Sequence, residues 1–233
     1  AVFGYVGSTF GAYAEFLCIS EDKAIARKPA NMTHAEAATV PYGAIMARNL
    51  LEKANLQPGQ KVLINGASGS IGAAAVQLAK HAGAEVTGVC STRRLAYVKA
   101  LGADKVIDYT VEEFTGNGET YDLIFDVLGR SSFGKCADSL KPGGIYLLAS
   151  FKTNALMQMM RTSLGGDKKV ICALASEQPG DLDFIRELIE AGQYKAIVDK
   201  CFPLDEAAAA HRYVEDGLKQ GAVVIGVAPN GKE

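Results

Sequence analysis

Residues 61–83 of the chain read KVLINGASGSIGAAAVQLAKHAG. The apolar run at 61–65 predicts a buried strand, and the alanine-rich run at 70–81 predicts a helix that Gly83 closes. A tight strand-to-helix turn needs small residues, and the amides at a helix N-terminus bind a pyrophosphate that can approach the backbone closely. The turn therefore predicts a dinucleotide site, although its glycines could serve only close packing of helix on strand. The candidate residues are Gly66, Ser68, Gly69, Ser70, Ile71 and Gly72.

The same alternation of strand and helix continues to residue 175. Short apolar runs bordered by Gly or Pro alternate with helical stretches, as expected for buried parallel strands. Further strands are expected at 85–89, 105–108, 121–127, 145–149 and 169–175, with helices at 94–101 and 131–140. Strands that alternate with helices form a parallel sheet, so the sequence predicts an α/β fold with a doubly wound sheet of the Rossmann type.

The segment before this pattern is predicted to be helical. Thr33 and Glu36 form a capping box that starts a short helix, which Pro41 interrupts. A second amphipathic helix follows and ends at the turn 57–59.

Beyond residue 177 the alternation stops. We expect a helix at 181–191, another after Pro203 and a strand at 222–227. Before the last strand of the sheet, Met157-Gln158-Met159-Met160 is expected to form an apolar loop.

The tip of the second predicted strand bears on the choice of dinucleotide. A site for NAD usually has an acidic residue there, roughly 20 positions after the glycine-rich turn, to bind the ribose 2′-hydroxyl. Here the tip reads Cys90-Ser91-Thr92-Arg93-Arg94, with two hydroxyls, two guanidinium groups and no carboxylate. Such donors suit a 2′-phosphate, so we predict NADP(H) bound by Ser91, Thr92, Arg93 and Arg94. A solvated basic helix start is the alternative interpretation.

Other motifs rich in glycine fit less well. A nucleophile elbow requires Gly where Ser70 stands, and a P-loop requires Lys after the last glycine. The Tyr-x-x-x-Lys pair of short-chain reductases occurs at none of the nine tyrosines.

Composition excludes several classes of partner. The 233 residues carry 24 basic and 26 acidic side chains, a net charge of −2, which leaves no electrostatic footprint for nucleic acid or an anionic membrane. The longest uncharged run, 62–79, is broken by polar residues and glycines and does not resemble a membrane span. A hydrophobic content of 48% suffices for one large domain or two small ones.

The five cysteines are scattered and never spaced as Cys-x-x-Cys, which argues against a disulfide framework and a structural zinc site. They favour a reducing, cytoplasmic location. Cys90 could be a reactive thiol beside two arginines, but a small buried residue is the favoured interpretation. The first residues, AVFGYVGSTFG, lack a signal-peptide pattern and read like a strand entered midway, so we expect a missing upstream segment.

Four further segments occur in the order typical of one family. They read FGAYAEF at 10–16, EAATVP at 36–41, LGAD with VIDY at 101–109, and PLDEAA with AHR at 203–212. With the glycine-rich turn, they resemble the medium-chain dehydrogenase/reductase superfamily, in particular its zinc-free, quinone oxidoreductase-like branch, to which zeta-crystallin belongs. The resemblance covers essentially the whole chain.

The resemblance implies a Rossmann domain inserted into a GroES-like catalytic domain that is only partly present. Residues 1–30 and 177–233 would belong to the catalytic lobe and 31–176 to the NADP-binding domain. Part of the substrate pocket would precede Ala1 in a complete member. Tyr42 stands where zinc-dependent members have a cysteine ligand, so the resemblance implies no metal.

The implied activity is hydride transfer from NADPH to a small molecule: a quinone, an enone or an alkenal. A conjugated acceptor suits an enzyme without a Lewis-acid metal. Two alternatives remain: an enoyl-thioester reductase on the same scaffold, and an NADPH-binding protein without turnover. The sequence identifies no catalytic residue.

The resemblance also extends the predicted site. Tyr109 would lie by the adenosine, and the ribose and nicotinamide would be bordered by Asp126, Val127, Leu128 and Gly129, at the end of the fourth strand. Two departures concern the nicotinamide end: Met46 replaces a common Thr, and Ala222 replaces a common Lys. The strand at 170–175 would be an exposed sheet edge, through which two copies pair as a homodimer.

Overall fold

The computed structural model describes residues 1–7, 11–149, 153–173, 178, 180–217 and 219–227. The chain divides into two compact units, one made of Ala1–Ile45 with Glu177–Glu233 and the other of Met46–Ser176. The segments 1–30 and 177–233, expected to belong together, lie in the first unit. The division after Ile45 falls inside a helix.

The second unit contains a six-stranded parallel sheet. In the order β5-β4-β3-β6-β7-β8, its strands are β5 (Lys105–Asp108), β4 (Glu85–Cys90), β3 (Lys61–Asn65), β6 (Tyr121–Asp126), β7 (Leu140–Leu148) and β8 (Lys169–Cys172). The order runs outward from β3 in both directions, which is the doubly wound arrangement. The predicted α/β fold with a Rossmann-type sheet is confirmed.

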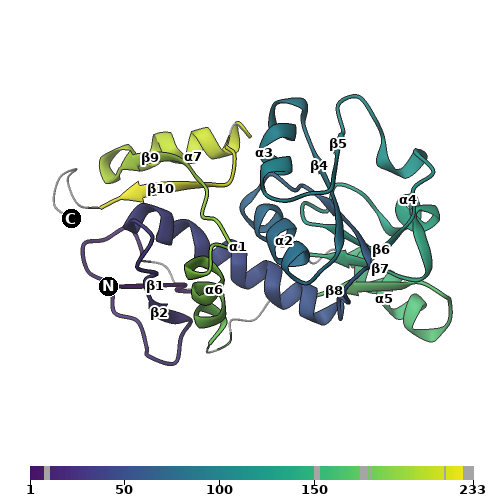
Figure 1. The fold of residues 1–233 in the computed structure, drawn as a ribbon, viewed down its shortest axis with the longest axis horizontal. Coiled ribbons are helices and arrows are strands. Elements are labelled where there is room, and N and C mark those ends of the chain that lie inside the picture. The colour runs from purple at the N-terminus through teal and green to yellow at the C-terminus, as the bar shows by residue number, and fades with distance from the viewer. Residues whose placement is uncertain (8–10, 150–152, 174–177, 179, 218, 228–233) are drawn as a thin grey trace. The chain divides into compact units, whose positions relative to one another are not determined.

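Helices cover both faces of this sheet (Figure 1). On one face, Gly88 of β4 lies so close to Val98 of α3 (Leu95–Ala100) that an added Cβ would be 2.5 Å from it. That face also carries α2 (Ser70–His81) against β3 and β4. On the other face are α4 (Phe133–Cys136) and α5 (Thr153–Leu164).

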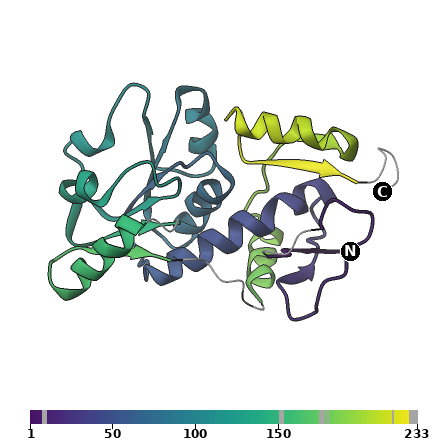
Figure 2. The ribbon, with the colours of Figure 1, turned by 180° about the vertical axis from the view of Figure 1, so that it is seen from behind.

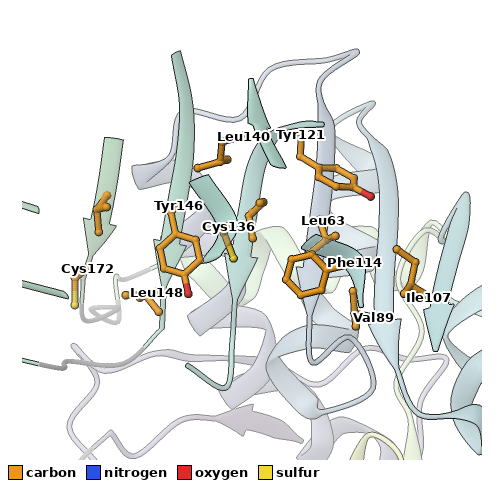
Figure 3. Packing of buried hydrophobic residues seen from close by; sticks show 12 residues of the cluster. Leu63, Val89, Ile107, Phe114, Tyr121, Cys136, Leu140, Tyr146, Leu148 and Cys172 are labelled. Carbon is orange, nitrogen blue, oxygen red and sulfur yellow. The ribbon is translucent and has the colours of Figure 1, made fainter. Parts of the chain in front are cut away.

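The core below α4 and α5 follows from strand register. Leu63, Ile124 and Tyr146 are aligned across three neighbouring strands, so their side chains point to the same face. Figure 3 shows this cluster, in which Cys136 of α4 lies beside Tyr146. All four residues are 0% exposed.

Among the described residues, the first unit contains two small sheets, two complete helices and the beginning of a third helix, α1 (His34–Lys53). Strands β1 (Val2–Gly4) and β2 (Ile25–Arg27) are antiparallel, whereas β9 (Val198–Pro203) and β10 (Ala222–Gly226) are parallel. Helix α6 (Asp181–Glu190) buries Leu182, Ile185, Leu188 and Ile189, as its apolar spacing predicts, and α7 (Ala207–Glu215) follows β9. The GroES-like nature of this unit stays a prediction.

The prediction that Pro41 interrupts the first helix was wrong. Helix α1 (His34–Lys53) is continuous through Pro41, as Figure 2 shows from behind. The capping box does form, because Thr33 N donates to Glu36 Oε2 at 2.8 Å and Glu36 N donates to Thr33 Oγ1 at 3.2 Å. A proline inside a helix costs about 3 kcal/mol, which the complete burial of side chains such as Ile45 offsets.

Four local expectations were also wrong. Residues 157–160 lie in α5 instead of a loop, and Met159 packs against the core. The expected helix at 131–140 is only α4 followed by a 3-10 turn (Ala137–Ser139), and β7 starts at Leu140 instead of Ile145. The FGAYAEF segment resembles a strand of the family, but its residues 11–16 form no strand, while Phe10 lies outside the described residues. The end of the expected edge strand, Leu174 and Ala175, also lies outside them.

Candidate functional site

The candidate site lies at the carboxyl ends of β3 and β6. These neighbouring strands are followed by chain segments that leave the sheet in opposite directions, which makes this pair the switch point of the doubly wound fold. Ligands of open parallel sheets bind in the crevice at such a point. Both the glycine-rich turn after β3 and the 127–129 segment after β6 therefore lie at this switch point.

Two glycines of the turn are required by packing within the fold. Gly66 has a φ of +92°, and an added Cβ would lie 2.9 Å from Cγ of Leu128. At Gly72, in the first turn of α2, an added Cβ would lie 2.1 Å from the Gly66 carbonyl oxygen. These two positions allow the helix to start directly against the end of β3.

Gly69 has no such packing reason. Its φ of −83° is open to any residue, and the nearest atom to an added Cβ is the Gly66 carbonyl oxygen at 3.8 Å. It is the N-cap of α2 and has no side chain to bond the free amides there. A missing side chain where the fold has room for one fits a site that a ligand's phosphate approaches.

The other predicted residues of the turn differ in burial. Ser68 is buried, whereas Ser70 and Ile71 are half-buried in the first turn of α2. The turn is anchored to β4, because the backbone amides of Gly66 and Ala67 both donate to the carbonyl oxygen of Val89.

The tip of β4 brings the predicted phosphate-binding residues together. Ser91 precedes a 3-10 turn formed by Thr92–Arg94. The Ser91 hydroxyl is buried and has no hydrogen-bond partner within the described part of the chain. A buried hydroxyl without a partner is costly, and a bound polar ligand would satisfy it. Arg93 is exposed and Arg94 is half-buried, and both belong to the turn that follows Ser91.

Asp108 also lies at this tip, which sequence reasoning missed. Cys90 and Asp108 are aligned in neighbouring strands, and Asp108 accepts hydrogen bonds from the Thr92 and Thr110 hydroxyls. These bonds lower the pKa of Asp108, so its carboxylate stays ionised near neutral pH. Thr92 is thus bonded to a carboxylate within the fold. The segment 90–94 contains no carboxylate, but the fold places one beside it, because Asp108 of the neighbouring strand β5 lies at the same tip.

Cys90 is a buried side chain rather than a reactive thiol. It is 1% exposed, and burial together with the nearby Asp108 carboxylate raises the pKa of its thiol to about 11, against the opposing effect of Arg94. The thiolate is the reactive form, so this cysteine is inert at neutral pH. Tyr109, the next predicted residue, is 52% exposed, and its amide donates to the Cys90 carbonyl oxygen.

A buried polar cluster stands behind the predicted nicotinamide end. Asp126, the last residue of β6, is 0% exposed. Its Oδ1 accepts from Asn65 Nδ2 at 3.0 Å, and its Oδ2 accepts from Ser131 N at 2.9 Å and from the Tyr146 hydroxyl at 2.8 Å. Burial and the Asp126 carboxylate raise the pKa of Tyr146 far above its ordinary value, so the phenol keeps its proton.

The segment after β6 is held against the glycine-rich turn. Val127 N donates to the Asn65 carbonyl oxygen at 3.1 Å, and Leu128, 53% exposed, lies over Gly66. Gly129 has a φ of +59°. Sequence reasoning placed residues 126–129 at the site but missed the hydrogen bonds that join Asp126 to Asn65 and Tyr146. The available signal was a polar residue at the end of two otherwise apolar strands.

The first unit contains a separate cavity of about 490 Å³. Phe3, Ala37 and Val224 are among its lining residues, and the Tyr13 hydroxyl and His211 Nε2, 3.0 Å apart, lie in its wall. None of the predicted cofactor residues lines this cavity.

No group of three or more His, Cys, Asp or Glu side chains that could hold a metal ion occurs among the residues that the structure describes. Tyr42 is 49% exposed, and its ring lies 6.0 Å from that of Tyr5. Zinc independence stays a prediction. No helix in the described ranges is long and apolar enough to cross a lipid bilayer.

Known proteins are similar to this chain in both sequence and fold. Residues 101–225 match the family described as zinc-binding dehydrogenase. The chain is 32% identical over 225 residues to 2-methylene-furan-3-one reductase of Solanum lycopersicum, covering 94% of this chain and 54% of that protein. It is 31% identical to the chloroplastic NADPH-dependent alkenal/one oxidoreductase of Arabidopsis thaliana, covering 93% and 53%.

A solved structure of the quinone oxidoreductase from Coxiella burnetii superposes with a TM-score of 0.85 at 28% identity, covering 97% of this chain and 72% of that one. The chain spans about half the length of the two curated relatives named above.

Proposed function

Because this chain belongs to the medium-chain dehydrogenase/reductase superfamily, in its quinone oxidoreductase-like branch, we propose that it binds NADPH at the β3–β6 switch point. In a complete protein, we propose further, the bound NADPH reduces a conjugated small molecule without zinc. The coarser assignment, an oxidoreductase that uses a nicotinamide cofactor, accords with the relatives named above.

The observation that carries the proposal is the glycine-rich turn at the switch point. Gly66 and Gly72 are explained by packing, but Gly69 is not, and it is the N-cap of α2. A pyrophosphate held there would sit on the amides at the start of this helix and on the positive end of the α2 dipole. The backbone of residues 68–71 is the part of the chain that would hold it.

Three side chains support NADPH over NADH. The unpartnered Ser91 hydroxyl and the two arginines after it suit a 2′-phosphate, which needs donors and positive charge. An acidic residue that bonded the ribose 2′-hydroxyl would favour NADH instead. Asp108 is the carboxylate at this tip, and both its oxygens already accept bonds from Thr92 and Thr110.

The chemistry would be shared between cofactor and chain. NADPH supplies a hydride when bound. Leu128 and Gly129 would contact the nicotinamide. The hydrogen bond between Asn65 and Asp126 would hold the strand ends that carry this segment. Tyr42, in place of a cysteine ligand, supports a reaction without zinc, for which a quinone, an enone or an alkenal is a suitable acceptor. The oxidoreductase named for alkenals and enones is a relative at 31% identity.

The proposal also includes a homodimer and a cytoplasmic location. Strand β8 is an edge of the six-stranded sheet, and pairing two copies along it would remove an exposed edge. The cytoplasmic location rests on the free cysteines alone.

A parallel titration with NADPH and NADH, followed by reduced-nicotinamide fluorescence, tests the cofactor. We expect NADPH to bind at least about tenfold more tightly, since a 2′-phosphate gains charge-assisted bonds. Arg94→Ala, with Arg93→Ala, should remove that preference and leave NADH binding unchanged. Equal affinities in the unsubstituted chain would refute the 2′-phosphate assignment.

Gly69→Ala tests the pyrophosphate position. The fold has room for the methyl group, so stability should fall by no more than about 1 kcal/mol, the usual size of an N-cap effect. NADPH binding should nevertheless be lost, because the methyl group would occupy the place of the phosphate. Unchanged NADPH affinity would mean that the phosphate does not approach Gly69.

The acceptor is tested separately, by a screen of quinones, enones and enoyl thioesters with a full-length protein.

A further inference from the structure

The burial of the Asp126 side chain is unfavourable for the stability of the fold. This side chain is completely buried, and within the described part of the chain it accepts from three neutral donors: the Asn65 side-chain amide, the Ser131 backbone amide and the Tyr146 hydroxyl. Burying a carboxylate without a cation costs stability even when it is well hydrogen-bonded. The neighbouring residue in register on β7, Leu148, is apolar and buried, so the sheet does not require a polar side chain at this depth.

The position of these partners indicates what the carboxylate does. Asn65 ends β3 and Asp126 ends β6, so their hydrogen bond joins the two strands that flank the switch point. Tyr146 holds the same carboxylate from β7, and Ser131 N holds it from the loop that follows β6. Asp126 thus joins β3, β6 and β7 near their carboxyl ends, and it also holds the segment that runs from 127 to 131.

We propose that Asp126 is a positioning residue of the cofactor site. It fixes the segment 127–129 against the glycine-rich turn, and so determines where the nicotinamide half of a bound dinucleotide lies. The adenosine half, held by the tip of β4, is independent of it. The inference rests on the proposed binding of NADPH, which it deepens by assigning the two halves of the cofactor to separate structural supports.

The test compares two ligands in one set of variants. NADPH contains both halves of the cofactor, whereas 2′,5′-ADP contains only the adenosine half with its 2′-phosphate. Asp126→Asn keeps the shape of the side chain but turns one acceptor into a donor. We expect it to weaken NADPH at least about tenfold, because misplacing a binding segment by an ångström has effects of this size. The affinity for 2′,5′-ADP, measured by calorimetry, should change less than about twofold.

Asn65→Ala is the second variant, and it keeps the test valid if Asp126→Asn does not fold. Asn65 is only half-buried, and its loss removes one donor from Asp126 Oδ1. We expect the same split between the two ligands, with a smaller loss for NADPH.

Asp122→Asn is the matched control. Asp122 lies on the same strand and the same face, four residues earlier, and it bonds Lys61 N at 2.7 Å and Lys141 Nζ at 2.6 Å. It is at the opposite end of the sheet from the site, so it should leave both affinities unchanged. This control separates a local effect at the switch point from general weakening of the sheet.

The outcomes are distinguishable. Equal loss of both ligands in Asp126→Asn and Asn65→Ala, or loss of neither, would overturn the positioning role while the proposed function stands. If the unsubstituted chain binds neither NADPH nor 2′,5′-ADP, the proposed function fails and this inference fails with it.

Discussion

At the scale of single residues, the glycines of the 66–72 turn serve two different purposes, close packing of the chain and the proposed binding of a phosphate. Gly66 and Gly72 lack side chains because the chain approaches itself there, while Gly69 lacks one without an internal reason. Packing and ligand binding can therefore be tested at different glycines of the same turn.

Gly72→Ala should destabilise the second unit. Its Cβ would lie 2.1 Å from the Gly66 carbonyl oxygen, so the backbone must shift, and overpacking of this kind costs about 1–3 kcal/mol. Thermal unfolding measures the effect. Gly134→Ala is the control, because nothing lies within 4 Å of an added Cβ there, and it should leave stability unchanged or slightly higher. An unchanged midpoint for Gly72→Ala would contradict this account of the turn.

The cysteines should fall into two classes by reactivity. Cys18 and Cys201 are exposed, whereas Cys90, Cys136 and Cys172 are buried. With a pKa of about 11, the Cys90 thiol is ionised to only about one part in a thousand at pH 8. A thiol reagent should modify two cysteines quickly at pH 8 and the other three only after denaturation. Rapid modification of Cys90 in the native chain would show that its burial is wrong.

At the scale of elements, one ion pair joins helix α2 to the sheet. Asp104, just before β5, accepts from Lys80 Nζ of α2 at 2.8 Å and from Val86 N of β4 at 2.7 Å. Burial by itself would raise the pKa of Asp104, but the bonds from Lys80 and Val86 outweigh it and hold the pKa below its ordinary value.

The lowered pKa of Asp104 predicts how the stability of the protein depends on pH in acid. A carboxyl group whose pKa is lower in the folded state stabilises that state above the unfolded-state pKa, near 4, and loses the contribution as pH falls through the folded-state value. Asp104→Asn should therefore lower the unfolding midpoint at pH 7 and reduce the loss of stability between pH 4 and pH 2. Identical pH profiles for the two proteins would exclude Asp104 as a contributor.

At the scale of the whole molecule, the proposed homodimer depends on an unprotected sheet edge. Ile171 is half-buried on β8, at one edge, and Val106 is half-buried on β5, at the other. Ile171→Asp should convert a dimer to a monomer, as measured by light scattering, because a charge on the pairing strand opposes edge-to-edge association. Val106→Asp should leave the dimer intact. A monomeric unsubstituted chain would refute pairing by this part of the protein.

Local pattern alone was sufficient for the strand–turn–helix unit at 61–83. Its apolar run, glycines and alanine-rich helix are neighbours in sequence, so their preferences act together before any distant contact forms. The same holds for the capping box at Thr33 and Glu36 and for the apolar face of α6. The alternation of such units determined the parallel sheet, because parallel strands require a crossover between them.

Only the tertiary structure decided the features that depend on distant residues. Burial keeps α1 helical through Pro41 against the local cost of a proline. Asp108 reaches Thr92 from 16 positions away, and Asp126 joins Asn65 across 61 positions and Tyr146 across 20. Hydrogen bonds of this kind follow from strand order and register, which set the neighbours of each strand end. The pattern of a single sequence shows the two-residue period of a strand, but it does not show which other strand ends lie next to that strand.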